Sequence, residues 1–207
     1  MGEAEQRVAP LVAVVDDDDA ARISLVRLLE VAGYAARGFD TGSDFLASAD
    51  VAALSCVVSD LQMPGVSGLD LQKALLARGV QVPMVFVTGF GTVAAGVQAM
   101  RDGAVDFLEK PADPGALLEA VERAVAKRAT LAARAEASAD VQRRVVLLTA
   151  RERQVFEGVV QGLANKQIAA QLGIALKTVK VHRGRVMQKM EADSVADLVR
   201  FAEALGL

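Results

Sequence analysis

The amino-acid sequence predicts a doubly wound α/β domain, built on a five-stranded parallel sheet, followed by a small all-α domain of four helices. Five short apolar runs alternate with longer stretches of helical periodicity up to about residue 125, as parallel strands with crossover helices do. The tail from residue 147 has helix start and stop signals but no such runs. The net charge is −9 over residues 1–125, +3 over 126–148 and +3 over 149–207. We therefore expect a first domain at 1–125, a helical linker at 126–146 and a second domain at 147–207.

The composition favours a protein of the cytoplasm. The chain has 207 residues, of which 53% are hydrophobic, so two small domains can each bury a core. One cysteine excludes an internal disulfide and suits a reducing compartment. The segment Met1–Pro10 is charged and lacks the apolar core of a secretion signal. No run approaches the roughly 18 apolar residues of a membrane span, so we expect no membrane partner.

The strands and helices of the first domain follow from the position of its apolar residues. The predicted strands are runs of four or five mostly apolar residues, at 11–15, 35–39, 55–59, 84–87 and 105–108. The predicted helices lie at 20–31, 42–46, 69–77, 93–101 and 114–126. In the first helix, Ile23, Val26 and Leu29 recur at helical spacing. The last helix has Asp113 as its cap and Pro114 at its first position.

The linker is also expected to be helical. Residues 124–141 are rich in Ala, Arg and Lys and contain neither Gly nor Pro. Alanine has the highest helix propensity, so we expect a helix that runs out of the first domain as a semi-rigid connection. The alternative is a flexible spacer.

The second domain begins with a capping box, in which Thr149 and Glu152 can each bond the main chain of the other. Helices are expected at 150–161, 166–172, 176–190 and 195–205. Asn165 and Ser194 stand where the second and fourth helices need a cap, and Gly173 stands where the second helix ends. Two helices joined by a turn that contains Gly outline a helix-turn-helix.

Polar groups stand just after four of the five predicted strands. Asp16 and Asp17 follow the first strand, Asp60 the third, Thr88 the fourth and Lys110 the fifth. Ligands bind at the carboxyl ends of the strands in open α/β sheets, so these groups should share one crevice. Two carboxylates about 4 Å apart repel by roughly 4 kcal/mol at an effective dielectric constant near 20, which calls for a counter-charge. A hard cation such as Mg²⁺, or Mn²⁺, suits oxygen ligands, and a lysine with a hydroxyl can hold phosphoryl oxygens.

Four segments make the first domain resemble a known family. Val14–Asp17, Asp60–Pro64 with Gly68, Thr88 and Lys110–Pro111 match the receiver domain of bacterial two-component response regulators in residue type and spacing. The resemblance covers residues 8 to about 127. It implies a flavodoxin-like sheet with strand order 2-1-3-4-5. It also implies that Asp60 accepts a phosphoryl group from a sensor histidine kinase.

The same resemblance implies a metal site in the acidic pocket. It assigns Asp17 and Asp60 as side-chain ligands of Mg²⁺ or Mn²⁺, Asp16 as a ligand through water, and Gln62 as a ligand through its main-chain carbonyl. A carboxylate is a feasible nucleophile for phosphorus, and metal and lysine would neutralise the charge that develops.

The resemblance also implies groups that sense the phosphoryl group. Thr88 and Lys110 would contact its oxygens, and Phe107 occupies the position of a switch aromatic that moves with the threonine. Pro111 matches a proline that usually follows a cis bond. Two residues depart from related chains: Ala112 replaces a larger apolar residue, and Phe90 stands where close relatives often carry His.

The third helix of the second domain has one basic face and one apolar face. Its basic residues, with no acid before the last of them, are Lys177, Lys180, Arg183, Arg185 and Lys189. Its apolar residues Val179, Val186 and Met190 must pack on the rest of the domain. A basic helix preceded by a tight turn is typical of a recognition helix in the DNA major groove.

Three segments of this domain resemble the LuxR/FixJ (NarL) type of output domain: Leu148–Arg153, Gly162–Ala169 and Thr178–His182. The resemblance implies four helices, with the third in the groove and the fourth helping dimerisation. The residues expected to meet DNA are Asn165, Lys166, Lys177, Thr178, Lys180, Val181, Arg185 and Lys189. Ala175 replaces the Ser usual before the third helix, and losing such a cap typically costs about 1 kcal/mol. The single histidine, His182, suits a structural or phosphate-contact role.

These features predict a phosphorylation-controlled transcription regulator that is not an enzyme. Phosphorylation of Asp60 would promote dimerisation and binding to double-stranded promoter DNA, with RNA polymerase as a further partner. One alternative is a Mg²⁺-dependent phosphatase of the haloacid-dehalogenase type, but such sites carry a second acid two residues after the nucleophile, where this chain has Gln62. The other is a DNA-binding protein that needs no phosphorylation.

Overall fold

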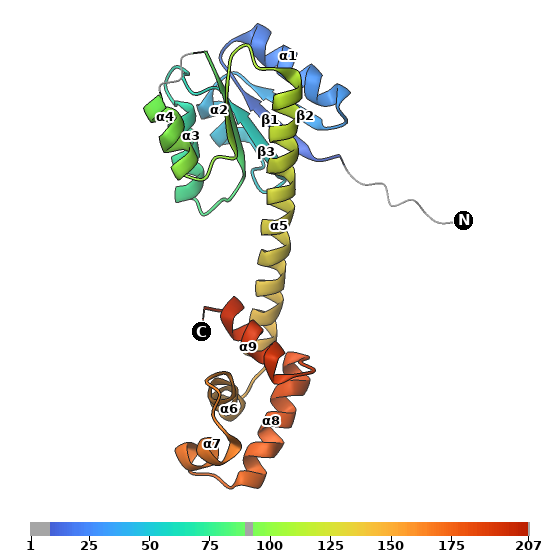
Figure 1. Ribbon diagram of the computed structural model, residues 1–207, viewed down its shortest axis with the longest axis vertical. Coiled ribbons are helices and arrows are strands. Elements are labelled where there is room, and N and C mark those ends of the chain that lie inside the picture. The colour runs from blue at the N-terminus through green and yellow to red at the C-terminus, as the bar shows by residue number, and fades with distance from the viewer. Residues whose placement is uncertain (1–8, 90–92, 207) are drawn as a thin grey trace, which may run out of the picture. The chain divides into compact units, whose positions relative to one another are not determined.

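The computed structural model describes residues 9–89 and 93–206, drawn as ribbons in Figure 1. The chain divides into two compact units, Met1–Leu131 and Ala132–Leu207. Within the described ranges, no helix is both long enough and apolar enough to cross a membrane. The domain boundaries expected at 125 and 147 stay predictions. Residues of the expected linker pack in each of the two units, as described below.

The first unit contains the predicted five-stranded parallel sheet. Its strands are β1 (Leu11–Val15), β2 (Ala35–Phe39), β3 (Leu54–Ser59), β4 (Met84–Thr88) and β5 (Asp106–Glu109). The order β2-β1-β3-β4-β5 confirms the expected topology. The chain moves outward in opposite directions from β1 and β3, so these two strands form the switch point of the sheet. Their carboxyl ends therefore flank the crevice where α/β proteins bind ligands.

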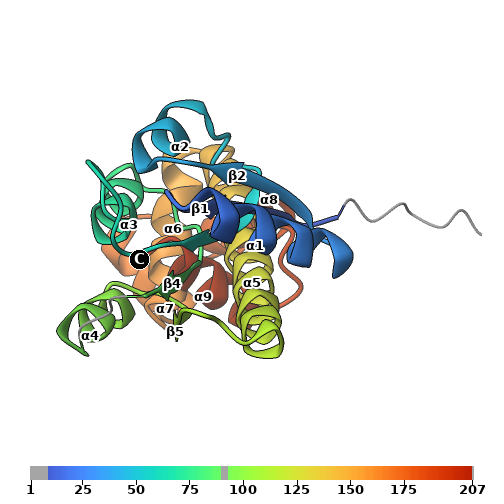
Figure 2. The same cartoon turned by 90° about the horizontal axis from the view of Figure 1, so that it is seen from above.

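Helices cover both faces of this sheet. They are α1 (Asp19–Val31), α2 (Gly42–Ser48), α3 (Gly68–Ala77), α4 (Val93–Arg101) and α5 (Pro114–Val146). Leu29 of α1 and Leu117 of α5 belong to the core on one face, and Phe45 of α2 and Leu71 of α3 to the core on the other. Figure 2 shows α1 and α5 on one side of the strands and α3 and α4 on the opposite side. The hydrophobic strands are thus buried on both faces, as their composition predicts.

Helix α5 does not end with the first unit. The domain helix expected at 114–126 and the helical linker expected after it form one continuous helix over Pro114–Val146, as a helix that runs out of the first domain should. No Gly or Pro follows Gly115 in this span, so the sequence contains no stop signal.

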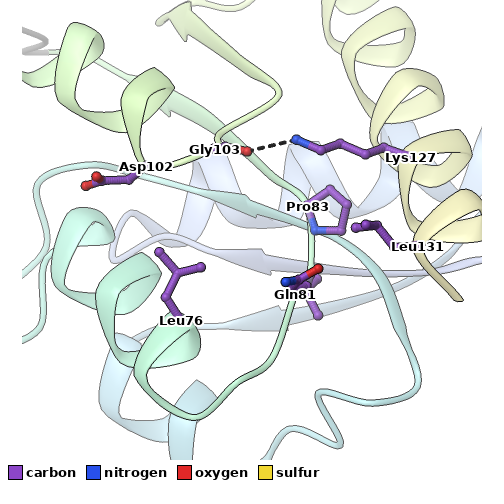
Figure 3. A pocket seen from close by; sticks show the side chains of 8 residues that line it. Leu76, Gln81, Pro83, Asp102, Gly103, Lys127 and Leu131 are labelled. Atoms are coloured by element: carbon purple, nitrogen blue, oxygen red, sulfur yellow. Dashed lines mark hydrogen bonds between the residues drawn. The ribbon is translucent and has the colours of Figure 1, made fainter. Parts of the chain in front are cut away.

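Two basic residues of α5 bond this helix to the end of the sheet where the strands begin. Arg128 donates to the main-chain oxygens of Leu54, Gln81 and Ala52 at 3.2, 3.1 and 3.0 Å. Lys127 Nζ donates to Gly103 O at 3.1 Å, the bond drawn in Figure 3. These carbonyls lie at the start of β3 and in the segments that lead into β3, β4 and β5. The neighbouring cavity of about 190 Å³ is smaller than most ligand sites and lies at the edge of the sheet opposite Asp60.

The second unit contains the four predicted helices. They are α6 (Ala150–Val160), α7 (Asn165–Leu172), α8 (Leu176–Met190) and α9 (Val195–Ala204). The end of α5 joins their core, since Val141 and Val145 are 5% and 8% exposed and pack in the same cluster as Phe156. Arg144 donates to Met190 O at 3.0 Å. Part of the expected linker therefore belongs to the core of this unit.

The helix starts of this unit confirm two predicted caps and correct one. The capping box of Thr149 with Glu152 is present, and Ser194 caps α9. The prediction that Asn165 caps α7 is wrong, because Ala164 holds the cap position and Asn165 is the first helical residue. The amide oxygen of Asn165 instead accepts a bond from Arg183 of α8 at 2.9 Å. Ala175 does precede α8, and its side chain provides no capping bond.

The capping carboxylate of α6 also forms an ion pair with a partly exposed lysine of α8. Glu152 is 2% exposed, and its Oε2 lies 2.7 Å from Lys189 Nζ and accepts the Thr149 N–H at 2.9 Å. The bond from Lys189, with help from the Thr149 N–H, lowers the pKa of Glu152 from its ordinary 4.5 to about 2. Lys189 Nζ also donates to Leu147 O at 2.9 Å. One ammonium group thus joins the start of α6 to the end of α8.

We predict that Arg128→Ala weakens the first unit. Removing three charged hydrogen bonds should lower its free energy of unfolding by about 1–2 kcal/mol, because solvent can replace the donor only in part. Amide hydrogen exchange in β3 and β4 reports this unit by itself. Arg134→Ala, at an exposed position of the same helix, is the matched control and should leave the exchange unchanged. Equal protection in both variants would show that the clamp adds no stability.

We predict that the Glu152 ion pair makes the second unit sensitive to acid. The folded pKa lies below the unfolded one, so the stabilisation is complete above about pH 4.5 and disappears as the pH falls toward 2. It should amount to about 2 kcal/mol, since solvent screens the partly exposed Lys189. Scanning calorimetry from pH 3 to 7 should show that Glu152→Gln is destabilised at pH 6 and approaches wild type at pH 3. Glu157→Gln, exposed on the same helix, should stay parallel to wild type. A gap for Glu152→Gln that does not change with pH would contradict the assignment.

Candidate functional site

The three predicted acids meet at the switch point of the sheet. Parallel pairing sets Val15 of β1 beside Ser59 of β3, and Asp60 N donates to Val15 O at 2.8 Å. Asp16 and Asp60, which follow these strands, therefore lie side by side, with Asp17 next to them. Each of the three offers a carboxylate oxygen within 4.8 Å of the others. Asp16 is 1% exposed and Asp60 is 8% exposed, whereas Asp17 faces solvent.

Lys110 bridges two of these acids. Its Nζ lies 2.7 Å from Asp16 Oδ2 and 2.7 Å from Asp60 Oδ2. Lys110 N donates to Thr88 O at 2.9 Å, which brings the ends of β4 and β5 together. The Lys110–Pro111 bond is cis, as the resemblance implied. The structure thus brings Asp16, Asp60 and Lys110 into contact and puts buried Thr88 on the neighbouring strand end.

The electrostatics of the pocket favour a cation. Burial raises the pKa of Asp16, although bonds from Lys110 and the Asp18 N–H oppose this. Burial alone would lower the pKa of Lys110, but its bonds to Asp16 and Asp60 outweigh burial and raise it. Lys110 therefore stays charged, and its single ammonium contacts two of the three acids. The remaining negative charge and the all-oxygen donor set fit a hard divalent cation.

The loop after β3 packs tightly around Asp60. Gln62 N donates to Asp60 Oδ1 at 3.2 Å, so the main chain of the predicted ligand Gln62 lies against this carboxylate. A Cβ added to Gly68, at the start of α3, would lie 2.3 Å from Asp60 O. Only glycine fits there, which gives a physical reason for Gly68 in the motif.

Phe107 lies on β5 opposite Phe86 of β4 and is half-buried. Its ring lies about 3.7 Å from where a Cβ on Gly96 of α4 would stand, so α4 and β5 pack closely there. Its role as a switch stays a prediction. Phe90 falls outside the described residues. Ala112 lines a depression of about 420 Å³ together with Lys110, Pro111 and residues of α1.

The loop between β1 and α1 contains a contact that sequence reasoning missed. Asp18 is the N-cap of α1 and accepts from Ala20 N and Ala21 N. Arg22 Nη1 donates to Asp16 O at 2.6 Å, and Arg22 also pairs with Asp19. The available signal was an arginine in the first turn of a helix that begins with acids, which is a weak one.

Helix α8 divides its residues as a recognition helix should. Six residues of this helix are predicted to face DNA. All of them except Lys189 are exposed: Lys177, Thr178, Lys180, Val181 and Arg185. Val179, Val186 and Met190 are fully buried in the core. Lys166 is exposed at the start of α7.

Three polar residues near this surface differ in their hydrogen bonds inside the unit. Asn165 is engaged by Arg183, which ties α7 to α8. Lys189 is held by Glu152 and Leu147, and its contact with DNA stays a prediction. Among the described residues, His182 Nδ1 is buried without a hydrogen-bond partner.

Each of the two units matches a known protein family. The model of the family "Response regulator receiver domain" matches residues 12–122, and that of "Bacterial regulatory proteins, luxR family" matches residues 146–202. Transcriptional regulatory protein FixJ of Azorhizobium caulinodans is 45% identical over 196 residues, which cover 95% of this chain and 93% of that protein. Nodulation protein W of Bradyrhizobium diazoefficiens is 40% identical over 206 residues, covering 100% and 91%.

Solved structures give the same result. The response regulator StyR matches with a TM-score of 0.81 and 42% identity, covering 94% of this chain and 98% of that one. Full-length FixJ from B. japonicum matches with a TM-score of 0.57 and 42% identity, covering 95% and 97%. Because both domains and nearly the whole length are matched at this identity, the chain belongs to the FixJ-like response regulators, which join a receiver domain to a LuxR-family DNA-binding domain.

Proposed function

We propose that a sensor histidine kinase phosphorylates this protein on Asp60 in the cytoplasm, and that the phosphorylated form dimerises and binds promoter DNA. The observation that carries the proposal is the position of Lys110, whose ammonium lies 2.7 Å from both Asp16 and Asp60. This arrangement supplies a nucleophilic carboxylate together with a cation for the phosphoryl oxygens.

The transfer itself needs one bond to form and one to break. An Asp60 carboxylate oxygen attacks phosphorus, the P–N bond of the phosphohistidine breaks, and its electron pair returns to the imidazole nitrogen. The product is an aspartyl phosphate. Lys110, already bonded to Asp60 Oδ2, can then donate to a phosphoryl oxygen.

The acidic pocket fits Mg²⁺ or Mn²⁺ as its cation. Asp17 and Asp60 would bind it through their side chains, Gln62 through its main-chain carbonyl and Asp16 through water. When bound, such an ion neutralises charge on the phosphoryl oxygens. Thr88, at the buried end of β4, would meet the same oxygens, and Phe107 on the adjacent strand would follow its movement.

The depression beside Lys110 supports docking of the kinase. It is lined by Ala21 and Leu25 of α1 and by Pro111 and Ala112 on the other side. These small and apolar side chains leave space for a helix that brings a phosphohistidine to Asp60. In this proposal the protein is the phosphoryl acceptor, and the histidine kinase is the enzyme.

The exposed face of α8 supports binding in the DNA major groove. Lys177, Lys180 and Arg185 provide charge for phosphates, and Thr178 and Val181 lie between them at helical spacing. We assign the fourth helix of this domain, α9, to the dimer, and we infer that RNA polymerase is the further partner at the promoter.

We predict that acetyl phosphate with Mg²⁺ adds one phosphoryl group to the wild-type protein and none to Asp60→Asn. Intact mass spectrometry measures the adduct directly. Asp50→Asn removes an exposed acid of the same domain and should be modified like wild type. An adduct on Asp60→Asn, or a kinase-phosphorylated wild type that binds DNA no better than before, would refute the switch.

We predict that Lys180→Ala weakens DNA binding and flattens its dependence on salt. Losing one phosphate contact should reduce the slope of log K against log salt by about one unit. Fluorescence anisotropy with a promoter fragment at several salt concentrations measures both. Lys73→Ala removes the same charge from the receiver and should change neither. An unchanged slope for Lys180→Ala would mean that this lysine does not meet phosphate.

A further inference from the structure

Arg22 crosses from α1 back to the end of β1. Its Nη1 donates to the main-chain oxygen of Asp16 at 2.6 Å, and the same guanidinium pairs with Asp19. The side chain is 16% exposed, so it is largely covered. Its stem rests on β2, where a Cβ added to Gly38 would lie 3.1 Å from Arg22 Cγ and Cδ. Arg22 is therefore held in place by packing as well as by its polar partners.

The segment that Arg22 holds is the one that presents two of the three acids. Asp16 and Asp17 stand between the last residue of β1 and the cap of α1, Asp18. Three other bonds shape this turn: Asp18 N donates to Asp16 Oδ1, and Asp18 Oδ1 accepts from Ala20 N and from Ala21 N. Arg22 supplies a fourth bond, the one to the Asp16 carbonyl. The peptide plane that joins Asp16 to Asp17 is thereby fixed at its oxygen.

We propose that Arg22 is a positioning residue that fixes the Asp16–Asp17 peptide, so that both carboxylates face a divalent cation without rearrangement. The inference deepens the proposed function and rests on it. Groups that orient ligands without touching the metal typically change its affinity by about 10- to 100-fold when removed. Arg22 acts on Asp17 only through the main chain, so the lower end of this range applies.

Electrostatics and positioning predict opposite signs for the loss of Arg22. A guanidinium beside an acidic pocket repels a second cation, so removing its charge alone would tighten Mg²⁺ binding. Releasing the Asp16–Asp17 peptide would weaken Mg²⁺ binding, because the loop must then be ordered when the ion binds. The direction of the change therefore decides between the two effects.

The test is the Mg²⁺ affinity of the full-length Arg22→Ala protein, followed by amide NMR shifts in the receiver. We expect the dissociation constant to rise about tenfold. Hydrogen exchange without Mg²⁺ should become faster at residues 16–20 while the amides of β3 keep their protection. Arg27→Ala is the matched control, since Arg27 lies on the exposed side of the same helix and carries the same charge. It should bind Mg²⁺ like wild type.

Mg²⁺ binding by Arg22→Ala that is unchanged or tighter than wild type would overturn the proposal, even if the variant melts earlier. If Arg22→Ala does not fold, Arg22→Lys is read by the same criterion, because lysine keeps the stem and the charge but lacks the two-pronged donor. Failure of phosphodonors to modify wild-type Asp60 would sink the proposed function itself. That result is distinct from an effect of Arg22 on Mg²⁺ alone.

Discussion

The first unit depends on how three carboxylates are kept together at the ends of β1 and β3. Strand pairing forces Asp16 and Asp60 into one crevice, and burial makes their mutual repulsion costly. Lys110 offsets that repulsion by contacting both acids, and it can do so because β5 ends beside Thr88. The negative charge that remains favours a divalent metal ion in the pocket.

Much of this unit could be predicted from its sequence. Buried parallel strands have sequences of short apolar runs. Polar residues after these runs, such as Asp60 and Lys110, indicate where the crevice lies. The predicted strands differ from the observed ones only at their ends. The contact of Arg22 could not be predicted in this way. Its partner is a main-chain carbonyl, which every residue has, so the sequence does not show which one is bound. The same is true of Arg128 and its three carbonyls.

In the second unit, the sequence predicted the helices better than the use of their polar residues. Composition showed that α8 is basic, but it could not separate lysines that face solvent from one that pairs with a carboxylate of the same unit. Lys180 is exposed, whereas Lys189 pairs with Glu152, a residue that the capping box had already assigned to α6. Tertiary contacts between elements decided this, as they decided that Asn165 bonds Arg183 and does not cap α7.

Gly68 has a genetic consequence. A methyl group at this position would overlap the main-chain oxygen of Asp60, so any substitution must displace the acceptor itself or the start of α3. Substitutions at residue 68 would then disturb the main chain of Asp60 while retaining the Asp60 carboxylate itself. Compensating changes would be rare, because the obstacle is the backbone and cannot be removed by shortening another side chain. Residue 68 is thus constrained to glycine by the main chain beside it, although its own side chain takes no part in the site.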